Sequence, residues 1–109
     1  MSWKILLHET WRREKPVETF IVSLPKKTQA KVAHVIDLLH EHGHKLGMPY
    51  SKQLSGGLYE LRIRSVPSVR IFYTFRKMNI YLLHAFKKKT QNTPRKELET
   101  ARKRLETLD

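Results

Sequence analysis

Three runs of apolar residues, separated by short turns, constrain the fold more than any other feature of the sequence. They cover residues 58–64, 69–75 and 80–86, with Pro67 in the first turn and residues 77–79 in the second. In the first two runs successive residues alternate between two faces of different character, as in a β-strand. The third run is nearly all apolar, which fits a strand buried on both faces. Consecutive strands with short turns pair antiparallel, so the sequence predicts a three-stranded meander.

Segments with helical periodicity precede and follow this meander in the sequence. Pro16 opens a segment whose apolar residues recur at helical spacing, and a second such segment runs from Pro25 to Gly43, where glycine favours a stop. Thr93 and Pro94 have the residue types of an N-cap and a first helical position, and they open a last amphipathic segment.

A short strand over residues 3–8 is expected to come first, and residues 46–57, rich in turn-forming residues, are expected to form a loop. The predicted order is β-α-α-β-β-β-α. This is an α+β fold in which the antiparallel meander packs against a helical hairpin and a C-terminal helix. A length of 109 residues fits one domain, expected to cover residues 1–109.

Positive charge is concentrated where the sheet is expected. The net charge is +12, and residues 46–92 carry nine basic side chains and one acidic side chain, Glu60. Clustered basic charge is the usual footprint of nucleic-acid binding. A highly soluble protein with no anionic partner is the alternative. Binding to a membrane surface fits less well, because it would need a basic helical face. We therefore expect a polyanionic partner, with RNA the first candidate.

Several functional classes are excluded or disfavoured by composition. The absence of cysteine excludes disulfides and thiolate metal sites. No signal-peptide pattern and no apolar run of about 18 residues is present, so a cytoplasmic protein without a membrane partner is expected. His40 and His44 have zinc-ligand spacing but no suitable third ligand, so neither a metal nor a cofactor is expected.

Basic residues from separate segments could converge on one phosphate. Arg62 and Arg64 share a strand face, Arg70 begins the next strand, Lys52 precedes the meander and residues 87–89 follow it. Arginine binds phosphate through a planar fork, and lysine binds it as a compact charge. A solvated basic face is the alternative, and we favour a phosphate site because arginines on core strands usually have a partner.

Aromatic residues among these cations could stack on unpaired bases. Tyr50 and Tyr59 are the candidates, and Tyr50 is the less easily explained by packing because it lies in the expected loop. Phe72 and Tyr81 fit core positions. His84, on the apolar last strand, fits a hydrogen-bonded core histidine better than a catalyst.

A nuclease built on two metal ions is disfavoured, because it would need several carboxylates and Glu60 is the single acid between residues 42 and 96. RNA cleavage would then use the 2′-OH as nucleophile. It would need a base for that hydroxyl, cations for the phosphorane charge and an acid for the leaving 5′-oxygen.

Three segments of this sequence, HGHKLGMPYSKQLSGGLYELRIR, VRIFYTF and IYLLHAFKKKTQNTPRKELETARKRL, together resemble the HigB-like, often phage-associated branch of the RelE/ParE toxin superfamily. The helical segment PVETFIVSLPKKTQAKV also fits, so the resemblance covers nearly the whole chain. It implies a RelE-like fold and a toxin of a type II toxin–antitoxin module. For RelE and HigB members it implies a metal-independent, ribosome-dependent mRNA endonuclease (an mRNA interferase).

The resemblance also implies partners and residue roles. The implied partners are a helix-turn-helix antitoxin and the ribosome with its mRNA. Operator DNA is expected to be contacted only through the antitoxin. Arg64 is expected to bind the scissile phosphate and Arg70 matches a basic position on the next strand. Lys88 is expected to stabilise the transition state, and Lys52 to act as a base or charge stabiliser. Expected RNA contacts are Arg62, Lys87, Lys89, Tyr50 and Tyr59.

The sequence departs from this family pattern at its C-terminal end. Several members carry a Tyr or His there that aids catalysis, but no Tyr, His or Trp follows Phe86. The general acid and base are therefore unassigned, with Lys87, Lys89, Tyr50 and Tyr59 as candidates. Two other functions remain open: ParE-like inhibition of DNA gyrase, and a non-catalytic basic module that binds nucleic acid or the antitoxin.

Overall fold

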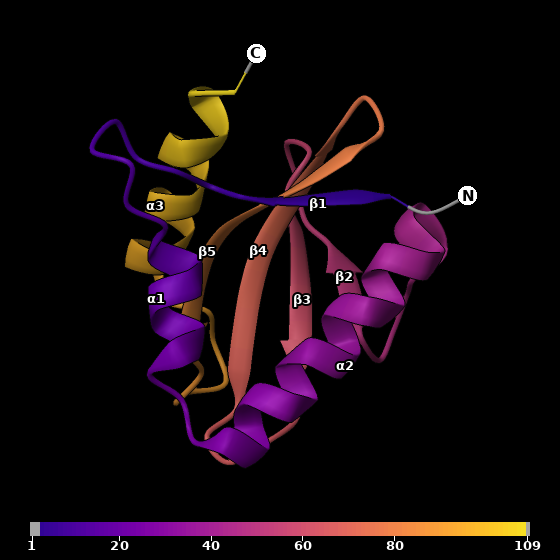
Figure 1. Cartoon of the computed structure of the whole chain (residues 1–109), viewed down its shortest axis with the longest axis vertical. Coiled ribbons are helices and arrows are strands. Elements are labelled where there is room, and N and C mark those ends of the chain that lie inside the picture. Colours follow the sequence, from indigo (N-terminus) through magenta and orange to yellow (C-terminus); the bar gives the residue numbers. More distant parts are fainter. Residues whose placement is uncertain (1–2, 109) are drawn as a thin grey trace.

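The computed structural model of the chain describes residues 3–108. It contains a sheet and three α-helices, so the predicted α+β class is confirmed (Figure 1). The elements are β1 (Lys4–Leu7), α1 (Pro16–Val22), α2 (Lys26–His42), a 3-10 turn (Gly43–Lys45), β2 (Ser51–Gln53), β3 (Tyr59–Ile63), β4 (Val69–Arg76), β5 (Asn79–Lys87) and α3 (Arg95–Glu106).

The sheet has the order β1-β5-β4-β3-β2. β3, β4 and β5 form the predicted antiparallel meander, and β1 adds to it by pairing parallel with β5. The prediction of a loop over residues 46–57 is wrong in part, because Ser51–Gln53 forms β2 and pairs antiparallel with β3. This strand is short and mostly polar, so its pairing with β3, rather than any periodicity of its own, creates it.

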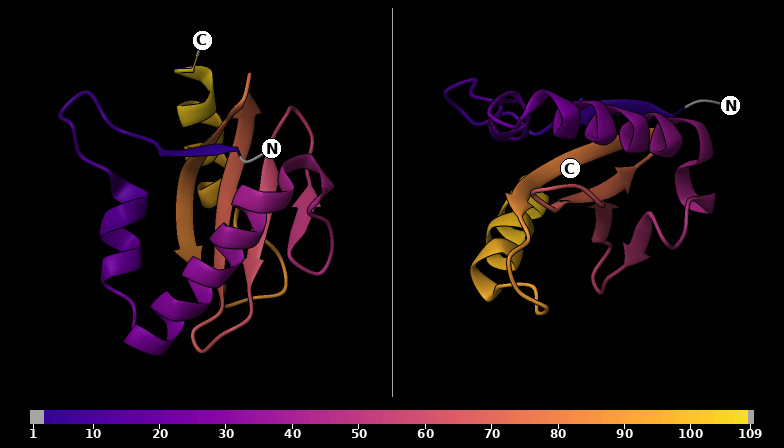
Figure 2. Two further views of the ribbon diagram at one scale, coloured as in Figure 1. Left: turned by 45° about the vertical axis from the view of Figure 1, so that its right-hand side comes forward. Right: turned by 90° about the horizontal axis from the view of Figure 1, so that it is seen from below.

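The two sheet faces are covered unequally (Figure 2). α1 and α2 lie over one face, where Val17, Val32 and Leu39 pack against the sheet in the larger apolar cluster. α3 lies over the other face and contacts β4 and β5. Residues of β5 belong to both apolar clusters, as predicted for a strand buried on both sides. The part of the second face over β2 and β3 is covered by no helix within residues 3–108.

The end of α2 follows the predicted stop at Gly43. This glycine has a φ of +54°, and a Cβ built on it would lie 1.8 Å from the indole nitrogen of Trp3. His44 then stacks its ring on Phe75, with centroids 3.6 Å apart. No helix of the described chain has the length and apolar character needed to cross a membrane.

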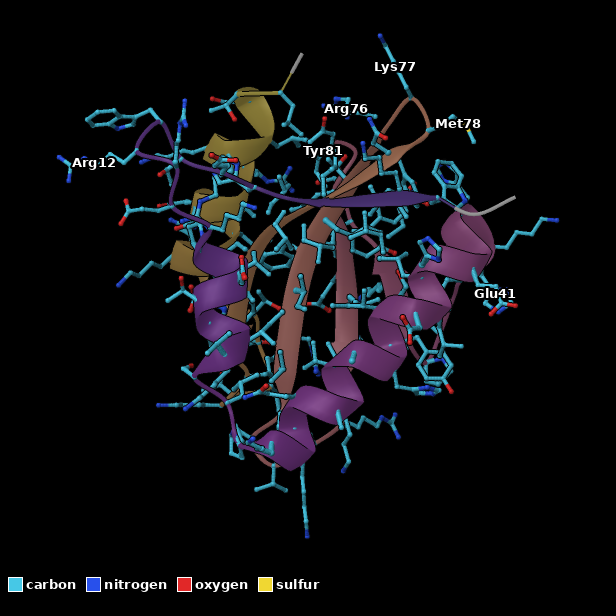
Figure 3. All side chains as sticks on the ribbon, in the orientation of Figure 1. Arg12, Glu41, Arg76, Lys77, Met78 and Tyr81 are labelled. Atoms are coloured by element: carbon cyan, nitrogen blue, oxygen red, sulfur yellow. The ribbon has the colours of Figure 1, made fainter. Side chains whose placement is uncertain are left out.

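β4 and β5 form the longest hairpin of the sheet. Its turn carries Lys77, which has a φ of +57° and projects from the tip together with Met78 (Figure 3). Arg76 ends β4 beside this turn and donates hydrogen bonds to Thr74 and to the carbonyl of Phe75. The opposite end of the hairpin carries Arg70 and Lys87, so the two ends of β4 present different basic residues.

Candidate active site

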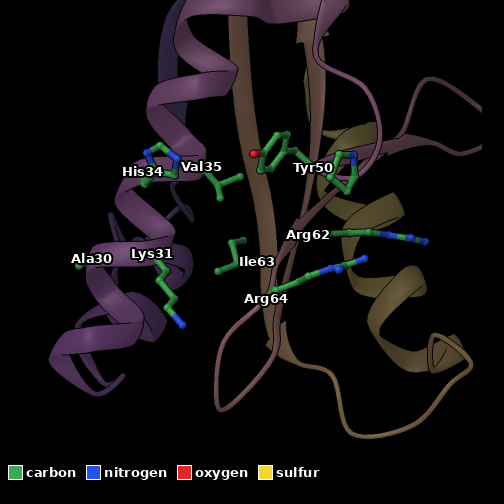
Figure 4. Close-up of a pocket in the computed structure, with 9 residues that line it drawn as sticks. Ala30, Lys31, His34, Val35, Tyr50, Arg62, Ile63 and Arg64 are labelled. Atoms are coloured by element: carbon green, nitrogen blue, oxygen red, sulfur yellow. The ribbon is translucent and has the colours of Figure 1, made fainter.

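Side-chain alternation along β3 separates the core from a polar face. Leu61 and Ile63 point into the larger apolar cluster and are fully buried. Arg62 and Arg64 extend the other way, away from α2 (Figure 4). The sequence predicted these two faces correctly, because alternation in a strand depends only on local geometry.

The sheet register brings basic residues from other strands to this face. Arg62 lies directly opposite Arg70 of β4, and Lys52 of β2 lies opposite Glu60 of β3. Lys88 follows β5, and its amide donates to the carbonyl of Ser68, which extends the β4–β5 pairing. Residues directly opposite each other in a sheet share a face. We refer to Lys52, Arg62, Arg64, Arg70 and Lys88 as the cationic cluster.

Glu60 lies at the centre of the cationic cluster and is only 2% exposed. Nε of Arg62 donates to its Oε1 at 3.0 Å, and Nε of Arg70 lies 4.0 Å from the same oxygen. Its other oxygen, Oε2, accepts a hydrogen bond of 3.3 Å from the hydroxyl of Thr93. The carboxylate thus joins two strands of the meander to the segment that precedes α3.

Two pKa shifts in the cationic cluster have burial as their main cause and the neighbouring charges as smaller causes. Burial lowers the pKa of Lys88 below its usual value; Glu60 opposes this shift, and Arg70, Arg62 and Lys52 strengthen it. Burial likewise lowers the pKa of Arg70, with Glu60 opposing and Arg62 and Arg64 strengthening the effect. The single carboxylate therefore leaves a net excess of positive charge.

Arg70 also has an unsatisfied donor. Its Nε is buried and has no hydrogen-bond partner among residues 3–108, because the nearest carboxylate oxygen, Oε1 of Glu60, is 4.0 Å away. Leaving such a donor unpaired costs free energy, about 1–3 kcal/mol. A phosphate bound at the exposed part of the Arg70 guanidinium, whose side chain is 16% exposed, would balance the excess charge.

Thr93 was expected to cap the last helix, and this prediction is wrong. α3 begins at Arg95 and its cap position is Pro94, with no side-chain cap hydrogen bond. The Thr93 hydroxyl donates to Glu60 instead and lies 3.5 Å from Nζ of Lys88, which itself donates to the carbonyl of Gln91 at 3.0 Å. Tertiary contacts with charged groups outweigh the local capping preference here.

Several expected RNA contacts lie outside the cationic cluster. Tyr59 is on the opposite sheet face, stacked on Tyr73 at a centroid distance of 5.3 Å. Lys87 ends β5 opposite Val69 of the larger apolar cluster, so its exposed side chain lies on the other face of the sheet. Lys89 is exposed beyond the end of β5. Only Arg62 of the expected RNA contacts belongs to the cluster.

Tyr50 is the remaining expected contact. It lines a cavity of about 430 Å³ between α2 and the edge of β3, and Figure 4 shows its ring turned toward Val35. Arg62 and Arg64 form part of the rim, but their charged ends point away from this cavity (Figure 4). The lining surface is mostly apolar, although Lys31 and His34 also border it, so the cationic cluster is the better candidate for phosphate chemistry.

His84 is half-buried and hydrogen-bonded, as predicted. Its Nδ1 accepts a hydrogen bond from Arg104 at 3.2 Å, which leaves Nε2 to donate to Glu97 at 2.7 Å. Arg104 also donates to the carbonyl of Leu83. These contacts tie α3 to β5.

The sequence alone pointed to no role in the site for Glu60, and it pointed only to a capping role for Thr93. The available signal for Glu60 was its isolation, since a single acid on a strand face that carries two arginines has an obvious pair of partners. No comparable signal pointed to Thr93, whose residue type and position fit an ordinary helix cap.

Comparison with known proteins places the chain in a family. The family model described as phage derived protein Gp49-like (DUF891) matches residues 19–106, which include every member of the cationic cluster and Glu60. No curated protein matches the chain. The Gp49-like family is a RelE-like family of toxins from toxin–antitoxin modules, and membership implies an antitoxin partner. This chain belongs to the phage-derived Gp49-like family of toxin–antitoxin toxins.

Proposed function

We propose that this protein is a HigB-like toxin that cleaves mRNA on the ribosome without a metal ion. The observation that carries the proposal is the convergence of five cations from separate segments on one sheet face, where the single carboxylate of Glu60 leaves a net excess of positive charge. Such a face suits a pentavalent phosphorane, whose extra negative charge needs preorganised donors. Residues 1–109 would act as one toxin domain in the cytoplasm.

The proposed reaction needs only groups from the RNA and the protein. The 2′-oxygen attacks the adjacent phosphorus and loses its proton, the bond to the 5′-oxygen breaks, and a 2′,3′-cyclic phosphate and a protonated 5′-hydroxyl result. Arg64 and Arg70 would hold the phosphate oxygens through charge-assisted hydrogen bonds. Arg62 would add positive charge beside them.

Lys88 is the proposed donor to the leaving oxygen. Its lowered pKa makes it a better proton donor than an ordinary lysine, while its charge still stabilises the phosphorane. Lys52, which lies on β2 directly opposite Glu60, would stabilise charge or take the proton from the 2′-hydroxyl. Lys87, Lys89, Tyr50 and Tyr59 are weaker candidates for acid or base, because they lie outside the cluster.

The proposed partners follow from the same function. A helix-turn-helix antitoxin would hold the toxin inactive and would alone contact operator DNA. The ribosome would present single-stranded mRNA to the cationic face.

The test is expression of wild type and four variants, with growth and mRNA cleavage followed together. Arg70→Ala and Lys88→Ala should each abolish growth arrest and cleavage. Arg76→Ala and Lys77→Ala, at the far end of the same hairpin (Figure 3), should leave both intact. Arrest without mRNA cleavage would favour gyrase inhibition, and RNA binding without cleavage would favour a non-catalytic module.

A further inference from the structure

Glu60 is an unexpected residue in a site that binds an anion. It is the single acid between residues 42 and 96 and lies within the cationic cluster, where its charge weakens the attraction for phosphate. Burying a carboxylate also carries a desolvation cost that its partners must offset. A residue that costs free energy and opposes binding needs another role in this site.

The contacts of Glu60 connect three segments that are distant in sequence. Oε1 accepts from Arg62 on its own strand and lies 4.0 Å from Arg70 on β4. Oε2 accepts from Thr93, whose hydroxyl is 3.5 Å from Nζ of Lys88. One carboxylate therefore reaches two cations directly and a third through Thr93.

Without a nearby negative charge, the side chains of these cations would adopt many orientations. Arginine and lysine side chains carry about 2 kcal/mol of rotamer entropy each, which favours many orientations over one. Arg62 and Arg70 also repel each other and Lys88. A fixed anion behind them offsets both effects, so the cations can be held in one arrangement before RNA arrives. Preorganised donors of this kind are the main source of electrostatic catalysis.

We propose that Glu60 is a positioning residue, which holds Arg62 and Arg70 on the sheet and, through Thr93, sets the place of Lys88. Glu60 does not act on RNA itself, since both of its oxygens are engaged and its side chain is 3% exposed. The inference rests on the proposed function for its effect on cleavage, but its effect on Lys88 can be measured without any cleavage.

The first variant is Glu60→Gln, which keeps the shape and removes the charge. Binding of a non-cleavable 2′-O-methyl RNA should be equal to or tighter than that of wild type, because one negative charge is gone. Single-turnover cleavage on the ribosome should fall about 10- to 100-fold, the size expected when reacting groups lose their positions. Glu97→Gln, which removes a carboxylate that contacts His84 outside the cluster, should show neither effect.

A second pair of variants isolates the link to Lys88 without a change of charge. Thr93→Val removes the hydroxyl and should slow cleavage, whereas Thr93→Ser retains it and should restore most of the rate. These substitutions are informative even if Glu60→Gln fails to fold.

The readout that a purely structural role would not move is the NMR titration of Lys88 in the two Thr93 variants, because both variants keep the Glu60 charge. The groups that face the Lys88 ammonium are Glu60, Arg70, Arg62 and Lys52. Loss of the Glu60 charge should lower the titration midpoint of Lys88 through the lost attraction alone. Thr93→Val should shift this midpoint and Thr93→Ser should not, because only Thr93→Val releases the ammonium from its place.

Three results would overturn the proposal. One is an unchanged Lys88 titration together with unchanged cleavage in Glu60→Gln. Another is a parallel loss of RNA binding and thermal stability, which would mean that Glu60 only supports the fold. The third is complete loss of cleavage in Glu60→Gln with normal cleavage in Thr93→Val, which would identify Glu60 as a base. If wild type cleaves no RNA, the proposed function fails, and the Lys88 titration in the two Thr93 variants still decides whether Glu60 positions Lys88 through Thr93.

Discussion

The salt dependence of RNA binding tests the cationic cluster most directly. Five cations and one carboxylate leave four net positive charges on the face proposed to hold the RNA backbone. For single-stranded nucleic acid each neutralised phosphate contributes about −0.7 to the slope of log K against log salt concentration, so wild type should show a slope of about −3. Arg70→Ala removes one charge and should bring the slope to about −2.

These slopes predict losses of affinity with salt that differ measurably between wild type and Arg70→Ala. Between about 50 and about 200 mM salt, the affinity of wild type should fall by about 50-fold and that of Arg70→Ala by about 20-fold. The assay is fluorescence anisotropy of a labelled 2′-O-methyl oligonucleotide, which cannot be cleaved. Arg76→Ala makes the same change of charge on the same strand at its other end and should keep the wild-type slope. An unaltered slope in Arg70→Ala, or an equal drop in Arg76→Ala, would refute the proposed binding face.

Two further predictions concern stability. Burial raises the pKa of Tyr73 to about 12, whereas the tyrosine of an unfolded chain has a pKa of about 10. The protonated Tyr73 side chain therefore contributes its full stabilisation below about pH 10, and this stabilisation is lost as the pH rises toward 12. Urea unfolding between pH 9 and 11 should show this decline, and it should be weaker in Tyr73→Phe; an identical decline in both proteins would contradict the assignment. Gly43→Ala should destabilise the fold by about 2–5 kcal/mol, because a side chain at φ +54° is strained and its Cβ would collide with Trp3. Thermal unfolding should show a clear drop in Tm for Gly43→Ala and little change for Gly47→Ala, whose Cβ would meet no atom within 4 Å; equal drops would refute the steric argument.

The sequence by itself determined the central strands, the helices and the two faces of the meander. Alternation placed Leu61 and Ile63 on the core face and Arg62 and Arg64 on the other, and the structure bears this out. Gly43 marked the end of α2 correctly. These features depend on backbone geometry and residue preferences over a few positions, which a single sequence contains in full.

Only the tertiary structure decided the edges of the sheet and the membership of the site. β2 and the parallel pairing of β1 depend on neighbouring strands rather than on their own short sequences. The residue type of Tyr59 suits an RNA contact, and the fold places its ring against Tyr73 on the sheet face opposite the cationic cluster. Thr93 had the residue type of a cap but lies within reach of two charged groups.

The physical reason is that local pattern determines which way a side chain points, but not what it meets there. Lys52 lies on β2, Arg70 on β4 and Lys88 just after β5. Their proximity depends on strand register and on α3 leaving part of one face without a helix. Glu60 could be recognised in the sequence as an isolated acid. Its contact with Thr93, which lies 33 residues further along the chain, follows only from the packing of the segment before α3 against the sheet.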